Sequence, residues 1–125
     1  MTSIRSHRDL IVWQKAMDLA ETVYHLAAKF PAIKTYRLCS QLTRAAASGP
    51  ANIAEGSARR SRRDYANFLS VAKGSLMETE TFLMLAVRLK YVSQNETATA
   101  FALLTEISKM LTSLRNRLKE GVNHG

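Results

Sequence analysis

The sequence has little of the residue types that define several protein classes. Cys39 is the only cysteine among 125 residues, so an intrachain disulfide is excluded and a reducing compartment is expected. Five glycines and two prolines are too few for a collagen-like or disordered chain. No apolar run approaches the roughly 18 residues of a membrane span, and LIVW after Arg8 is too short for a signal peptide. These absences predict a folded cytoplasmic protein.

Acidic residues are scarce relative to basic ones. Eighteen Lys and Arg stand against ten Asp and Glu, which gives a formal net charge of +8. Such a balance favours an anionic partner: nucleic acid first, an acidic protein next, and a membrane surface third. Solubility alone would also account for the excess of basic residues. The placement of the charges along the chain therefore has to distinguish solubility from an anionic partner.

Catalytic and metal-binding motifs are also absent. His7, His25 and His124 have no metal-ligand spacing, and the chain has no Glu-x-x-His motif, phosphate-binding glycine loop or nucleophile motif. We therefore expect no enzyme activity, no cofactor and no metal. Glu55 and Glu78 are the carboxylates that could do acid–base work, and replacing both by Gln would test that alternative.

Four segments carry apolar residues at every third or fourth position, the spacing of a helix that buries one face. They cover about 9–29, 34–57, 62–90 and 94–119, within a single domain over residues 1–125. Helices of this length with short connections predict an all-α protein, an antiparallel up-down-up-down four-helix bundle.

Local signals mark the expected helix ends. Asp9 could cap the first helix, and Ser61–Asp64 and Ser93–Glu96 resemble capping boxes for the third and fourth. Pro50 lies inside the second segment, where the apolar rhythm continues from Leu42 to Ile53, so it is expected to kink the helix rather than end it. Gly56 is expected to end that helix.

A polar stripe runs along one side of the second helix, at spacings of three and four residues: Gln41, Arg44, Ser48, Asn52 and Glu55. Small residues beside it would admit another helix closely and partly shield the stripe from water. Arg44 is then expected to meet Glu78 or Glu80 of another helix. We interpret Gln41, Arg44, Asn52, Glu55 and Glu78 as a structural polar network, with a binding cleft and a solvated face as alternatives.

The third helix is apolar around its whole circumference at residues 82–87, FLMLAV. A bundle helix needs only one apolar stripe. Either other helices cover this part on both sides, or it meets another subunit, and we favour oligomerisation.

Arginines are dense around the second connection and the end of the fourth helix. In an up-down-up-down bundle these segments meet at one end, although both ends are basic. The candidate nucleic-acid-binding residues there are Arg59, Arg60, Arg62, Arg63, Arg115, Arg117 and Lys119, with Arg5 and Arg8 nearby. Arg62 and Arg63 open a helix, where the dipole disfavours cations, so folding gives no evident reason for them. Phosphate binding would give a reason for both arginines.

Three blocks carry a family resemblance: RDLIVWQKAMDLA, YRLCSQLTRAAASGPANIAEG and RRDYANFLSVAKGSLMETET. Together they resemble the signature of the 23S ribosomal RNA intervening-sequence proteins over about residues 8–91. More distantly, the chain is similar to the accessory variability determinant of diversity-generating retroelements, a basic pentamer that binds nucleic acid and a reverse transcriptase. The resemblance implies a homopentamer. Trp13, Gln14, Arg44, Asn52, Glu55, Gly56, Ser75 and Glu78 match recurrent positions of the family, and Gly49 departs from a bulky apolar residue.

Charge, helical pattern and resemblance lead to one functional prediction. We expect a non-catalytic, oligomeric protein that binds nucleic acid, RNA in preference to DNA, by contacting phosphates with arginine-rich bundle ends. The alternative is an oligomeric scaffold or adaptor whose partner is another protein, such as a reverse transcriptase or polymerase.

Overall fold

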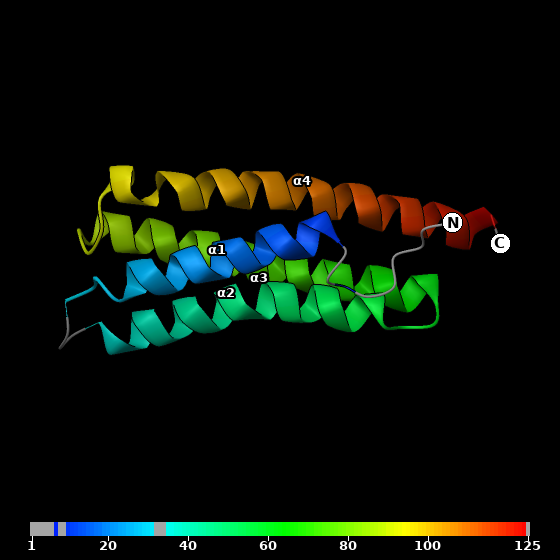
Figure 1. Ribbon diagram of the computed structural model, residues 1–125, viewed down its shortest axis with the longest axis horizontal. Coiled ribbons are helices and arrows are strands. Elements are labelled where there is room, and N and C mark those ends of the chain that lie inside the picture. The colour runs from blue at the N-terminus through cyan, green and yellow to red at the C-terminus, as the bar shows by residue number, and fades with distance from the viewer. Residues whose placement is uncertain (1–6, 8–9, 32–34, 125) are drawn as a thin grey trace.

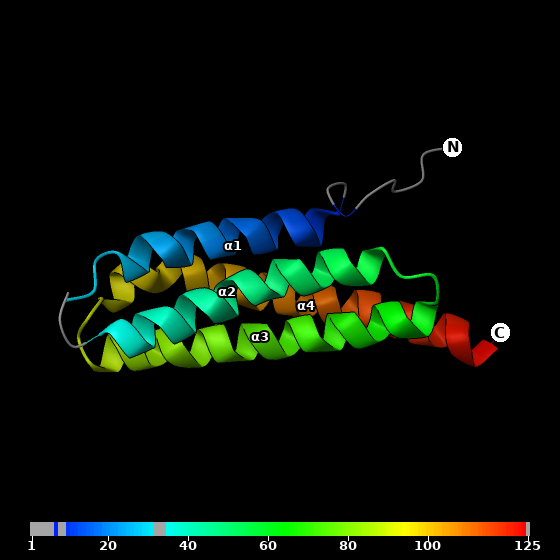
Figure 2. The same cartoon turned by 90° about the horizontal axis from the view of Figure 1, so that it is seen from below.

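The chain forms four helices in the computed structural model, which describes residue 7, residues 10–31 and residues 35–124, with side chains up to residue 120. They are α1 (Ile11–Ala27), α2 (Tyr36–Ser57), α3 (Arg62–Arg88) and α4 (Gln94–His124). No strand occurs in these ranges, so this part of the chain is all-α. No helix within them has the length and apolar character that crossing a membrane requires. Figures 1 and 2 show the four helices lying alongside one another along a common long axis.

Contacts at the two ends define how the helices are connected. Each helix packs against the next in the chain, and α1 also packs against α4. At one end, Lys29 after α1 pairs with Glu96 of α4 at 3.4 Å. At the other end, Arg62 of α3 donates to main-chain carbonyls near the end of α4. The α2–α3 connection therefore lies beside the end of α4, as Figure 1 shows.

The helix starts show which capping signals operate. The Ser61 hydroxyl accepts the Asp64 N–H at 3.0 Å, and Ser93 and Glu96 accept each other's backbone N–H at 3.0 Å. The N–H of Ser93, aided by Lys29, lowers the pKa of the Glu96 carboxyl. The expected cap Asp9 lies outside the described residues, and α1 begins after Leu10, whose side chain makes no capping bond. α4 continues to His124 rather than ending near residue 119.

Pro50 and Gly56 have different roles in α2. The helix continues through Pro50, as the apolar rhythm predicts. Gly56 does not end the helix, which continues to Ser57. Instead it is buried against α3, where an added Cβ would lie 2.7 Å from Cβ of Phe68. The prediction of a glycine stop was wrong because close approach of α2 to α3, not helix termination, is what requires glycine here.

The core lies between the four helices and leaves part of α3 uncovered. Its largest fully buried apolar side chains come from every helix: Leu19, Leu42, Ile53, Leu69, Leu83, Ile107 and Leu111. Within residues 82–87, Leu83 and Ala86 face this core, whereas Met84 and Leu85 are 53% and 42% exposed. Val71, Met77 and Leu89 are also exposed. α3 and the residue that follows it thus have an apolar outer face, which we define as Val71, Met77, Met84, Leu85 and Leu89.

Candidate nucleic-acid interface

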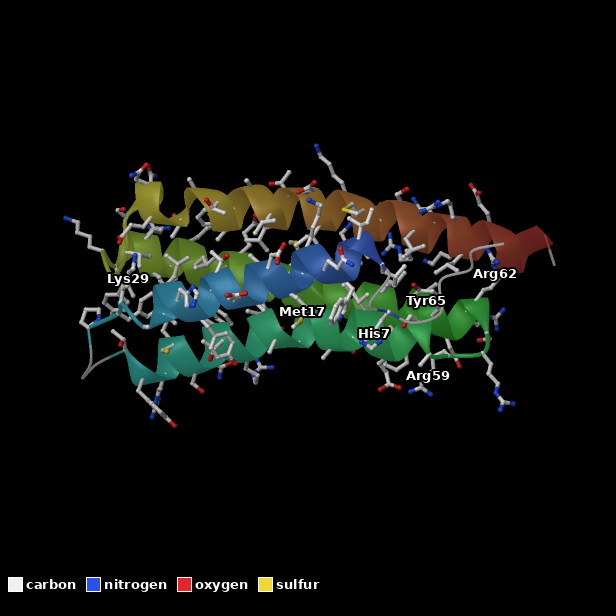
Figure 3. All side chains as sticks on the ribbon, in the orientation of Figure 1. His7, Met17, Lys29, Arg59, Arg62 and Tyr65 are labelled. Atoms are coloured by element: carbon white, nitrogen blue, oxygen red, sulfur yellow. The ribbon has the colours of Figure 1, made fainter. Side chains whose placement is uncertain are left out.

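The predicted cluster of cations comes from two segments that meet at one end of the molecule. We call it the arginine-rich end; its described members are Arg59, Arg60, Arg62, Arg63, Arg115, Arg117 and Lys119. Nε of Arg62 lies 3.5 Å from the Leu118 carbonyl oxygen, and its Nη2 lies 3.3 Å from that of Arg117. Figure 3 shows Arg62 pointing toward the end of α4. Arg5 and Arg8 lie outside the described residues.

Two of the exposed arginines in this cluster have structural partners. Arg59 pairs with Glu55 at 2.9 Å, and its guanidinium lies 4.6 Å from the centre of the Phe68 ring. Arg62 anchors the start of α3 to α4 through the two carbonyls. The expectation that folding supplies no reason for Arg62 was therefore wrong, because its contacts lie on a helix that is distant in sequence.

The other exposed cations are available to a ligand. Arg60, Arg63, Arg117 and Lys119 are exposed, and their side chains make no hydrogen bond or ion pair with the described part of the chain. Arg63 lies in the first turn of α3, where the helix dipole opposes a cation and Asp64 offsets part of that cost. Four unpaired cations at one end can bind phosphates without first breaking an internal ion pair.

Aromatic side chains near this end are not positioned to stack on bases. Tyr65 is half-buried, and burial raises the pKa of its hydroxyl. Both Tyr65 and Phe68 line the space beside Gly56. With the Arg59 guanidinium over the Phe68 ring, the interface offers charge rather than stacking surfaces.

Lys73 of α3 and Arg115 of α4 each reach across the contact between α3 and α4. Nη1 of Arg115 lies 3.5 Å from the Ser70 hydroxyl, and Nζ of Lys73 donates to the Thr112 hydroxyl at 2.6 Å. Lys73 is not among the candidate residues predicted from the sequence. Its position, four residues after Leu69 and three before Leu76, is a signal that would have placed it beside the core.

The polar stripe of α2 is divided into separate contacts. Arg44 bonds to Gln41 at 3.0 Å and pairs with Glu78 at 3.6 Å, which is one of the two predicted carboxylates. The Asn52 amide donates to Ser48 at 3.0 Å, and Ser75 of α3 donates to the same Ser48 hydroxyl at 2.8 Å.

Shielding of the stripe from water does not extend along its whole length. Ser48 and Asn52 are partly buried, but Gln41, Arg44, Glu55 and Glu78 are exposed. The contacts fix α2 against α3 at Ser75 and Glu78, and they do not enclose a polar cleft.

The carboxylates considered for acid–base work are held by different arginines. Glu55 pairs with Arg59, and Glu78 pairs with Arg44. No group of three His, Cys, Asp or Glu that could hold a metal ion occurs among the described residues.

Comparisons with known proteins found one family model and a similar solved structure. The model of the 23S rRNA-intervening sequence protein family matches residues 8–113. A crystal structure of a protein of unknown function from the S23 ribosomal protein family of Bacteroides thetaiotaomicron is similar to the chain, with a TM-score of 0.75 and 28% identity. The similarity covers 84% of this chain and 98% of that one. No match was found among curated proteins.

Proposed function

We propose that this chain, which belongs to the 23S rRNA-intervening sequence protein family, is a non-catalytic protein that binds nucleic acid through its arginine-rich end. The observation that carries the proposal is the set of four exposed and unpaired cations, Arg60, Arg63, Arg117 and Lys119. The family name refers to 23S rRNA, which is our reason for placing RNA ahead of DNA. The single cysteine is the reason for proposing a cytoplasmic location.

Phosphates are the part of the nucleic acid that this end would contact. Guanidinium groups form paired hydrogen bonds with phosphate oxygens, and phosphate contacts carry no sequence information of their own. Since the neighbouring aromatic rings are packed against the protein, we propose binding with little base preference.

Salt dependence of RNA binding tests the proposal. We expect the chain to bind a mixed-sequence RNA at low salt and to lose affinity steeply as salt rises, because each phosphate contact releases counterions. Four contacts with a single strand correspond to a slope of about −2.8 in log K against log salt concentration. Fluorescence anisotropy with labelled RNA between about 50 and 300 mM salt measures that slope. Absence of binding at low salt, or a slope near zero, contradicts the proposal.

We further propose that the unit is an antiparallel up-down-up-down bundle that assembles into a homo-oligomer, a pentamer on the family resemblance. The support is the apolar outer face of α3, of which Met77 and Met84 are more than half exposed. A Cβ at Gly74 of the same helix would meet no atom within 4 Å. Uncovered apolar surface of this kind is typical of a subunit interface.

Light scattering and sedimentation test the assembly. The wild type is expected to have about five times the 14.0 kDa mass of one chain. Met84→Lys with Leu85→Lys should lower that mass, since two charges would have to be desolvated at each subunit contact. Ile11→Lys with Met17→Lys is the matched control on α1, where both side chains are also exposed. A wild type that is monomeric at all concentrations, or equal dissociation by the control, contradicts the proposed interface.

The outer face of α3 also supports the alternative, a scaffold for another protein. In that case the protein would be an oligomeric scaffold or adaptor, and RNA would not bind. A protein partner would remain bound after nuclease treatment and would be lost with Met84→Lys and Leu85→Lys.

A further inference from the structure

Two cations lie half-buried where α3 packs against α4: Lys73, and Arg115 of the arginine-rich end. We define the α3–α4 seam as Ser70 and Lys73 of α3 with Thr112 and Arg115 of α4. Lys73 reaches the Thr112 hydroxyl at 2.6 Å, and Arg115 reaches the Ser70 hydroxyl at 3.5 Å. Nε of Arg115 is shielded from water and has no hydrogen-bond partner. The two pairs place two cationic donors along the contact of the two helices.

No carboxylate balances these two charges among the described residues. The ion pairs there involve Lys15, Lys29, Arg44 and Arg59. Lys15 is a useful comparison, because its side chain is 31% exposed and it pairs with Glu106 across α1 and α4 at 3.1 Å. Lys73 occupies the equivalent kind of position between α3 and α4, yet its partner is a neutral hydroxyl.

The two hydrogen bonds join α3 to α4, but they leave the charges poorly compensated within the chain. A cation that is partly removed from water costs free energy unless an opposite charge or several good acceptors compensate it. One hydroxyl at each cation is weak compensation, and the Nε of Arg115 has none. An apolar side chain of similar length would fill either position without that cost, so the charges point to an anion from outside the chain.

The seam is continuous with the arginine-rich end. Arg62 bridges α3 and α4 at its outer limit, and Arg63 and Lys119 are exposed beside it. From Arg62 to Lys73 the axis of α3 advances by about 16 Å, at about 1.5 Å per residue. Beyond Lys73 the same contact holds a groove of about 260 Å³, lined by Ser108, Lys109 and Glu80 among others. The Glu80 carboxylate places negative charge there. It therefore limits how far the positively charged part of the contact extends along the two helices.

We infer that the α3–α4 seam is a phosphate-binding groove that continues the arginine-rich end and holds the backbone of single-stranded RNA. The inference rests on the proposed function and adds a path and a strand preference to it. The donors of the seam are recessed between two helices. A flexible single strand can turn its phosphates toward them, whereas a rigid duplex reaches the exposed cations of the end. Proteins follow a single-stranded backbone through a positively charged groove, and Ser and Thr hydroxyls are among the groups that contact phosphates.

The inference is tested with a seam variant, Lys73→Met with Arg115→Gln. Its RNA binding is compared with that of three other proteins. These are the wild type, an end variant with Arg60→Gln and Arg63→Gln, and a charge-matched control with Arg37→Gln and Lys90→Gln. Arg37 and Lys90 are exposed and unpaired within the described residues and belong to the opposite end. Affinity for a 12-nucleotide mixed-sequence RNA, single-stranded or in a duplex, is measured by anisotropy across the same salt range.

The seam variant is expected to bind the single strand about 25-fold more weakly than the wild type at 0.1 M salt. Its salt slope should be less steep by about 1.4, the contribution of two single-strand contacts. Its affinity for the duplex should stay within twofold of the control. The end variant should weaken both ligands.

Two results separate the inference from the function on which it rests. If the seam variant binds the single strand like the control while the end variant is weakened, the inference is overturned and the proposed function stands. If the wild type binds neither ligand, both are overturned. Circular dichroism and urea unfolding check that each variant is folded. Lys73→Arg with Arg115→Lys retains both charges and should bind within about threefold of the wild type; a loss as large as that of the seam variant would overturn the phosphate contact.

Discussion

Replacement of Arg60, Arg63, Arg117 and Lys119 together by glutamine is expected to weaken RNA binding by several hundredfold at 0.1 M salt. These four side chains are exposed and unpaired within the described structure, so their removal breaks no internal ion pair. Each single-strand phosphate contact contributes about 0.7 to the salt slope, and four contribute about 2.8 log units relative to 1 M salt. Anisotropy titrations of the variant and the wild type measure both the affinity and the slope.

A control at the opposite end makes this result specific. Replacing Arg37, Arg88 and Lys90 by glutamine removes three exposed charges from that end and leaves the Lys29–Glu96 ion pair intact. We expect at most a few-fold effect, from the lower net charge. Equal weakening by the two variants would show that net charge alone attracts the RNA, and it would remove the arginine-rich end as the binding site.

Gly56→Ala is expected to lower the free energy of unfolding by about 2 kcal/mol. Alanine would gain up to about 1 kcal/mol from helix propensity, but overpacking at a close helix contact costs about 1–3 kcal/mol or more. The new Cβ would lie 2.7 Å from Cβ of Phe68 and 3.3 Å from the carbonyl oxygen of Tyr65. Neither atom is the free end of a flexible side chain, so α2 and α3 would have to separate. Urea unfolding followed by circular dichroism measures the change.

Gly74→Ala is the matched control, with the opposite expected sign. A Cβ at Gly74 meets nothing within 4 Å on the exposed side of α3. The substitution should therefore raise the free energy of unfolding by about 0.5–1 kcal/mol, the usual gain over glycine in a helix interior. A Gly56→Ala protein as stable as the wild type would show that the α2–α3 contact yields easily.

Much of the fold follows from local patterns in the sequence. Apolar spacing locates the four helices, since each buries one face against the others. The same spacing on both sides of Pro50 indicates a continuous α2. Capping at Ser61 and Ser93 depends on residues three positions apart, which a sequence displays directly.

The rest depends on distances between helices, which no local pattern contains. The carbonyl groups that accept hydrogen bonds from Arg62 belong to residues that are distant in the sequence. The same holds for the hydroxyl that accepts a hydrogen bond from Lys73. Gly56 looked like a helix end because its contact with Phe68 is visible only when α2 and α3 are packed. The arginine cluster could be predicted as a group, but which of its members are free to bind could not.

Main-chain acceptors for Arg62 have a consequence for how this surface can evolve. The carbonyl groups of residues 117 and 118 are present whatever side chains those positions carry, so mutation there leaves the acceptors in place. Surface charge beside them can then change between descendants while the attachment of α3 to α4 is inherited. The attachment of α3 to α4 and the exposed charges of this end can therefore diverge at different rates.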